Sequence, residues 1–324
     1  MKKTLVAVAA FAAVTGAFAD VTISGHVDQG YLTTTTNGTG AGKTTALAPI
    51  LAPNLLTFSG NEDLGSGLKA SFKMESSFNT SGATTGAGTV GNTGLTGARE
   101  SWVALSGAFG TVTLGQQYSS MFWNTLGTDP NGFNNLPGIT VTGNAGSSSW
   151  GPGQVMLAGS SAALVGSTDT ITYALPTLVE GVGVSVQSIR PTNTSQGNSA
   201  LVNYTNAGLY VGYSLRTAGA DRASSVAASY DFGVAKIGYT TIDATISAKK
   251  TTDSTYAISA PVGSGVSVGL TAGTMSVDGT KTTNAQAGAY YALSKRTSLY
   301  AVYGKAAQTA TSVTTTAFGV AHNF

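Results

Sequence analysis

The feature that most constrains this chain is an alternation of apolar and polar residues in segments of about ten. The clearest case is residues 68–79, where the charged residues all share one side of an extended chain. Helical spacing would scatter these charges around the axis, whereas a strand collects them on one face. The apolar face comprises Leu68, Ala70, Phe72, Met74 and Phe78, and the polar face comprises Lys69, Ser71, Lys73, Glu75 and Ser77. Similar alternation in residues 21–31, 209–216, 234–239 and 266–272 predicts strands that separate lipid from water.

The chain after residue 19 contains no run of about 18 apolar residues, which a transmembrane helix requires. The nearest candidate, residues 46–56, is interrupted by Pro49 and Pro53. A membrane protein without such helices must be a closed barrel, because lipid leaves no other partner for its backbone groups. Only 9% of residues are charged, yet 13 Tyr and 11 Phe argue against disorder. There is no cysteine, so a closed sheet rather than disulfides would supply stability.

The first nineteen residues have the pattern of a secretory signal peptide. Lys2 and Lys3 precede an apolar stretch over residues 5–14, and small residues follow at Ala17 and Ala19. A short membrane anchor is the alternative, but this stretch is too brief to cross about 30 Å of hydrocarbon. We therefore predict cleavage after residue 19 and a barrel over residues 20–324.

Cleavage would leave a chain without net charge. Removing Lys2 and Lys3 from the 16 basic residues leaves 14, against 14 acidic residues. A neutral chain without a basic run predicts neither nucleic acid nor anionic lipid headgroups as a partner. Membrane lipid is expected as the surroundings of the apolar strand faces.

Short turns alternate with longer connections rich in Gly, Ser, Thr and Asn. The predicted turns lie at residues 62–67, 107–110, 176–177, 231–233, 261–263 and 294–296, and the longer connections include 33–53 and 80–97. Bacterial barrels have short periplasmic turns and longer extracellular loops. The predicted fold is all-β: a transmembrane, antiparallel, up-and-down barrel of about sixteen strands with both termini in the periplasm.

The longest connection covers residues 119–160 and is too apolar for a loop in water. Its larger apolar residues are Met121, Phe122, Trp123, Phe133, Leu136, Ile139 and Trp150. A loop of this length usually has a function or a packing site, and folding into the barrel would provide both. We predict a constriction loop inside the lumen; an external loop is the alternative.

Five local strings, in order along the chain, resemble the general porins of Neisseria and Burkholderia. They are TFSGNEDLGSGLKASFKMESSFN from Thr57, RESWVALSGAFGTVTLGQQY from Arg99, TDTITYALPTLVEGVGVSVQ from Thr168, YALSKRTSLYAVYG from Tyr291 and the terminal FGVAHNF. The resemblance implies a homotrimer of sixteen-stranded barrels in the Gram-negative outer membrane, each with its third extracellular loop folded inward. It also implies that Phe324 belongs to a C-terminal signal read by the barrel-assembly machinery.

The leading functional prediction is a general diffusion porin, a water-filled channel for passive passage of small hydrophilic solutes and ions. The alternative is a surface adhesin or interaction barrel with little channel activity, whose long polar loops would bind partners. An enzyme is not expected, because the two histidines, His26 and His322, accompany no G-x-S-x-G motif. With no cysteines either, no metal site or cofactor is predicted.

The resemblance also implies arginines on the barrel wall, but the matching positions are the uncharged Ser59, Gln116 and Gly166. Other predicted pore-lining residues are few and of mixed sign: Lys69, Lys73, Glu75, Arg216, Lys236 and Asp28. Lys73 would lie within about 7 Å of Glu75 and offset its charge. Asp129 is the acidic residue of the constriction loop. We therefore predict a weakly charge-selective pore.

Overall fold

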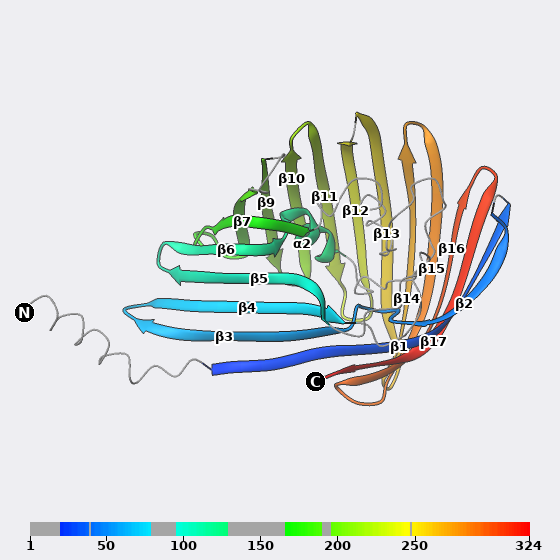
Figure 1. The fold of residues 1–324 in the computed structure, drawn as a ribbon, viewed down its shortest axis with the longest axis horizontal. Coiled ribbons are helices and arrows are strands. Elements are labelled where there is room, and N and C mark those ends of the chain that lie inside the picture. Colours follow the sequence, from blue (N-terminus) through cyan, green and yellow to red (C-terminus); the bar gives the residue numbers. More distant parts are fainter. Residues whose placement is uncertain (1–19, 39, 79–94, 129–165, 190–195, 247) are drawn as a thin grey trace, which may run out of the picture.

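A computed structural model of the chain describes residues 20–38, 40–78, 95–128, 166–189, 196–246 and 248–324. Almost all of the described chain is strand (Figure 1). In chain order the elements are β1 (Asp20–Gly38), β2 (Gly42–Ala48), β3 (Leu55–Gly65), β4 (Leu68–Phe78), β5 (Leu95–Gly107), β6 (Gly110–Tyr118), α2 (Ser120–Leu126), β7 (Gly166–Ala174), β8 (Val182–Ile189), β9 (Gly197–Asn206), β10 (Leu209–Ala218), β11 (Asp221–Asp231), β12 (Lys236–Ile246), β13 (Lys249–Gly263), β14 (Val266–Val277), β15 (Thr280–Ala292), β16 (Thr297–Gln308) and β17 (Thr311–Asn323). None of the helices in these ranges is long and apolar enough to cross a membrane.

The strands form one closed antiparallel ring. From β3 to β17 each strand pairs with its neighbours in sequence, and β1 pairs with β17 to close the barrel. Along its other edge β1 pairs with β2 through residues 30–36 and with β3 through residues 20–26. Because β2 and β3 are two halves of one interrupted strand, the seventeen segments make a barrel of sixteen strands. The predicted up-and-down barrel of about sixteen strands is confirmed.

The interruption between β2 and β3 is organised by Asp28. Its carboxylate accepts hydrogen bonds from the backbone N–H of Ile50 (2.7 Å) and Leu51, and from the Tyr300 hydroxyl. Asp28 is fully buried. The prediction that Asp28 is a lumenal charge was therefore wrong, because the local chain folds over it. The predicted loop over residues 33–53 was also wrong, since most of it is the β1–β2 hairpin.

The segment between β2 and β3 also explains why β16 is apolar on both faces. Ile50 is fully buried and packs in one cluster with Tyr300, Val302 and Ala306. These side chains point away from the outward face of β16, where Leu299 and Tyr303 are exposed. One of the two apolar faces of β16 is therefore covered by the chain itself.

The alternation predicted from the sequence is present around the ring. On β4 and β5, the exposed apolar side chains of Met74, Val103 and Leu105 mark the outward face. The residues between them, including Glu100 and Ala104, are buried on the opposite face. Since paired residues in a ladder share a face, the register carries this assignment from strand to strand.

The loop lengths differ from the prediction in one half of the barrel. At the end of the barrel opposite the termini, β10–β11, β14–β15 and β16–β17 are joined by two-residue turns. Asp278 and Gly279, with φ of 47° and 83°, have the positive values that a type I′ hairpin turn requires. The expected alternation of short turns with long loops therefore fails in the second half of the chain.

Candidate functional site: the lumen of the barrel

The inward face of the barrel carries many polar side chains, together with an apolar cluster of Met121, Ala223, Ile242, Ala244 and Ile246. On β10 to β13 it alternates with exposed outward residues such as Val211, Leu215, Val226 and Tyr256. The buried inward set of these strands includes Ser214, Arg216, Ser225, Ser229, Thr240, Asp253 and Thr255. A polar inner surface and an apolar outer one are what a barrel around a water-filled channel requires.

The helix α2 begins the long connection that follows β6. The Ser119 hydroxyl accepts a hydrogen bond from the Phe122 N–H (3.2 Å), which caps the first turn. Tyr118 stacks on Phe122, with ring centroids 4.1 Å apart, and Trp123 meets both rings edge-on. Two of the aromatic residues that made residues 119–160 too apolar for water, Phe122 and Trp123, thus pack together at its start.

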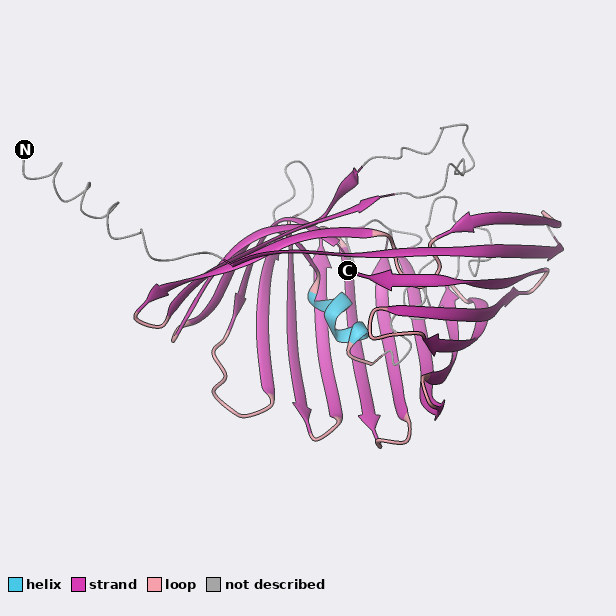
Figure 2. Cartoon of the chain, turned by 90° about the horizontal axis from the view of Figure 1, so that it is seen from below, coloured by secondary structure: helices cyan, strands magenta, loops and turns pink. Residues whose placement is uncertain are grey.

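Residues 119–128 lie against the inner wall of the barrel, where α2 contacts β8 to β11 (Figure 2). The Asn124 amide donates to the Ser225 hydroxyl (2.7 Å) and accepts from the Tyr210 hydroxyl (2.9 Å). The Ser120 N–H donates to the Gln187 side chain at 3.0 Å. The predicted constriction loop therefore starts inside the barrel, and its remainder, with Asp129, lies outside the described residues.

A compensated charge cluster lies on the inward side of β4 and β5. The Lys73 ammonium lies 3.0 Å from Glu75 Oε2 and also contacts Glu100. The Arg99 guanidinium lies 3.3 Å from Glu75 Oε1. Two cations face two carboxylates, so the cluster has no net charge. Both carboxylates are more than nine-tenths buried, and pairing offsets the desolvation that this burial costs.

Aromatic residues complete the cluster toward the lumen. The Trp102 indole N–H donates to Glu100 Oε1 (3.2 Å), and Arg99 lies over the Tyr118 ring at 5.5 Å from its centroid. Arg99 thereby links the cluster on β5 to the end of β6, from which α2 begins. Trp102 thus faces inward, whereas its neighbour Val103 is exposed on the outward face.

The predicted offset of Glu75 by Lys73 is present, but Arg99 and Glu100 were missed. A register shift beside Glu75 makes Arg99 the extra residue of β5 between the ladder pairs Glu75–Glu100 and Ser76–Ala98. Simple alternation would place the adjacent residues Arg99 and Glu100 on opposite faces. This bulge instead lets Arg99 reach Glu75 while Glu100 reaches Lys73. The sequence signal that could have found them is the adjacent pair Arg99 and Glu100, because the rest of β5 carries no charged residue.

The remaining predicted wall residues are spread around the ring. Ser59 pairs with Lys73 on the inward face, while Lys69 pairs with Ser106 close to the β3–β4 turn. Gln116 pairs with Ser101, which is exposed and shares the outward face with Val103. The register thus brings Ser59 to the charge cluster, separates Lys69 from it, and assigns Gln116 to the outward set.

Arg216 and Lys236 are both on the inward face but are far apart along their strands. Arg216 is buried near the β10–β11 turn, beside Ala223 in the ladder. Lys236 begins β12 at the opposite end and pairs with Asp231. The structure therefore does not gather the predicted cations at one level of the barrel.

The chain ends at the barrel seam. Phe324 exchanges two backbone hydrogen bonds with Gly25 of β1, at 3.0 and 3.1 Å. The two histidines lie on the paired strands β1 and β17 but bond to different partners: His26 to Asn323 and His322 to Thr297. The Thr297 hydroxyl lies 2.9 Å from His322 Nδ1, and this contact is exposed at the end of the barrel that holds the chain termini.

Sequence comparison places the chain in a family. A family model described as Gram-negative porin matches residues 4–311. The chain belongs to the Gram-negative porin family. Among its relatives, major outer membrane protein P.IB of Neisseria meningitidis serogroup B is 33% identical over 120 residues, which cover 36% of this chain and 34% of that protein. The Neisseria gonorrhoeae protein of the same name is 33% identical over 125 residues. These matches span about a third of each curated relative.

Solved porin structures share the fold over nearly the whole chain. An anion-selective porin from Comamonas acidovorans superposes with a TM-score of 0.76 at 23% identity, covering 95% of this chain and all of that one. OmpT of Vibrio cholerae in its trimer form gives a TM-score of 0.67 at 12% identity, covering 94% and 99% of the two chains. The family model and the solved structures therefore agree on a porin-type closed barrel.

Proposed function

We propose that this porin is a general diffusion channel through which small hydrophilic solutes and ions cross the outer membrane with weak preference for either charge. The observation that carries the weak selectivity is the cluster of Lys73, Arg99, Glu75 and Glu100, whose charges cancel. Rings of like charge make pores selective, and isolated charges in a wide lumen are screened over about 8 Å at physiological salt.

Single-channel recording in a planar bilayer tests this proposal. In a tenfold KCl gradient we expect step conductances and a reversal potential near zero. A reversal potential close to the chloride limit would overturn weak selectivity and show that Lys69, Arg216 and Lys236 dominate the field. Folded protein without ion current would instead favour the surface adhesin.

We further propose a homotrimer, supported by the solved trimer form of OmpT, which shares this fold. The role of Phe324 as an assembly signal belongs to the same proposal. Because Phe324 pairs with Gly25 through backbone atoms, a Phe324→Ala substitution removes the ring and keeps both hydrogen bonds. We expect less barrel in the outer membrane of cells and an unchanged thermal midpoint for protein refolded in detergent. Equal losses in both measurements would reduce Phe324 to a structural role.

A further inference from the structure

Three buried side-chain oxygens on the inward face of the barrel have no hydrogen-bond partner among the described residues. They are Asp253 Oδ2 on β13 and Asn284 Oδ1 and Gln286 Oε1 on β15. All three residues are more than nine-tenths buried. Each of these atoms is a hydrogen-bond acceptor, and a buried acceptor without a donor lowers the stability of the fold. Three such acceptors in one region point to a donor from outside the chain.

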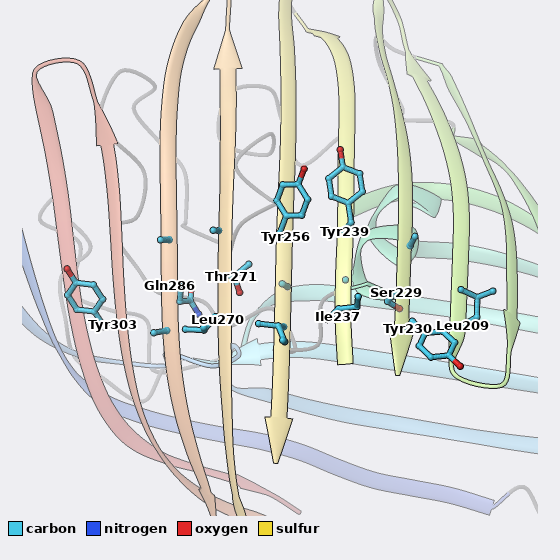
Figure 3. A pocket seen from close by; sticks show the side chains of 17 residues that line it. Leu209, Ser229, Tyr230, Ile237, Tyr239, Tyr256, Leu270, Thr271, Gln286 and Tyr303 are labelled. Atoms are coloured by element: carbon cyan, nitrogen blue, oxygen red, sulfur yellow. The ribbon is translucent and has the colours of Figure 1, made fainter. Parts of the chain in front are cut away.

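The register of β13, β14 and β15 brings these residues to one part of the lumenal wall. Thr255 and Asn284 lie on the same rung of the ladder, one on each side of β14. Asp253 precedes Thr255 by two residues and Gln286 follows Asn284 by two, so both share the inward face. Figure 3 shows Gln286 beside Thr271, its partner on β14. The unpartnered oxygens therefore follow one another across three neighbouring strands.

Gly273 of β14 lies between Thr255 and Asn284 and leaves a niche there. A β-carbon at this position would lie 2.9 Å from Thr255 Oγ1, 3.0 Å from the carbonyl oxygen of Ser254 and 3.1 Å from Asn284 Oδ1. The nearest atoms around the niche are thus all oxygens. Gly273 is only partly buried, so the niche is accessible from the lumen.

Asp253 supplies the charge of this niche. The Thr255 hydroxyl donates to Asp253 Oδ1 at 3.1 Å, which leaves the Thr255 oxygen as an acceptor. Asp253 forms no ion pair with a described residue. Lys249, on the same face of β13, is four residues or about 13 Å away. A buried carboxylate without a partner is costly, and a cation that joins it offsets this cost.

We propose that this niche binds the primary ammonium group of small organic cations that cross the channel. The ammonium group lies above Gly273 and donates to Asp253 Oδ2, Thr255 Oγ1 and Asn284 Oδ1. Gln286 Oε1 accepts from a further N–H or hydroxyl group of the same solute. A set of acceptors with one negative charge selects a cation that is also a hydrogen-bond donor. The inference rests on the proposed channel function, because an amine reaches the niche through an open lumen.

The test is block of the ion current through single channels of the folded barrel in planar bilayers. The probe is putrescine, a diamine, and the measured quantity is the putrescine concentration that halves the current. Asp253→Asn keeps the shape of the side chain and should raise this concentration about tenfold, because hydrogen bonds to charged groups are the strongest. Gly273→Ala keeps every charge but fills the niche, and should raise it several-fold.

Matched controls are available at the ends of the neighbouring strands. Asp278→Asn removes a carboxylate from the exposed β14–β15 turn. Gly263→Ala adds a β-carbon that would meet nothing within 4 Å. Both control variants should be blocked like the unmodified barrel. Heat-modifiable mobility on gels shows that each variant is folded.

Three results would overturn the proposal. These are unchanged block in Asp253→Asn, an equal loss of block in the control variants, or equal block by fully N-methylated putrescine, which has the same charges but no N–H donors. If Asp253→Asn does not fold, Gly273→Ala decides, because unchanged block in that variant contradicts the niche. A channel that conducts ions but is not blocked by putrescine refutes this inference alone, whereas a folded barrel without current refutes the proposed function.

Discussion

At the residue scale, the weak selectivity that we propose depends on the balance of four side chains in the β4–β5 cluster. Replacing Glu100 with Gln removes one of two carboxylates and leaves an excess positive charge on Lys73 and Arg99. We expect the reversal potential to move toward the chloride limit, with a change of about twofold in the permeability ratio. Lys73→Gln should move it in the opposite direction. Glu180→Gln, in the exposed β7–β8 connection, is the matched control, and an equal shift there would show that the cluster does not set selectivity.

Asp28 holds the segment between β2 and β3 in place through its hydrogen bonds. In Asp28→Ala, the backbone N–H groups of Ile50 and Leu51 and the Tyr300 hydroxyl lose their acceptor in a buried site. We expect the free energy of unfolding in detergent to fall by about 3 kcal/mol, measured from urea titration of the folded band on gels. Asp278→Asn, at an exposed turn position that favours asparagine, should leave the midpoint unchanged. A stable Asp28→Ala barrel would contradict the structural role of this carboxylate.

At the scale of elements, α2 fixes the start of the connection between β6 and β7 to the inner wall. We predict that deleting residues 129–160, which keeps α2 and its contacts to Ser225 and Tyr210, raises the unit conductance. The reason is that α2, from which this connection continues, is bonded to the inner wall of the barrel. Deleting residues 80–94 is the control and should leave the conductance unchanged. A folded 129–160 deletion with native conductance would support the external-loop alternative.

At the scale of the whole molecule, the closed ring predicts the behaviour of the protein in detergent. The barrel has sixteen strands, and the described residues contain one helix of 7 residues. The circular dichroism spectrum should therefore be dominated by β structure. A closed sheet has no free edges and resists dodecyl sulfate, so we expect a heat-modifiable band on gels, and an oligomeric one if the trimer forms. A helix-rich spectrum would contradict the fold.

The sequence alone determined the faces of the strands and hence the class of fold. Alternation is a local property with a period of two, so it can be seen before any strand finds its partner. The same reasoning paired Lys73 with Glu75, because residues two apart share a face and lie close in every register. The predicted number of strands was also correct, although the sequence did not show that β2 and β3 are two halves of one strand.

Tertiary structure alone decided what depends on closure and register. Asp28 alternates like a lumenal residue, but residues 49–54 fold over it, and the β5 bulge turns Arg99 toward Glu75. The exposed outward cations at the end opposite the termini, Lys43, Arg222, Lys250, Lys281 and Lys305, also come from different strands. The mature chain that carries them is predicted to have no net charge. Only the pairing of the strands around the ring sorts them onto one outward face, because the field at a surface depends on where charges lie rather than on their sum.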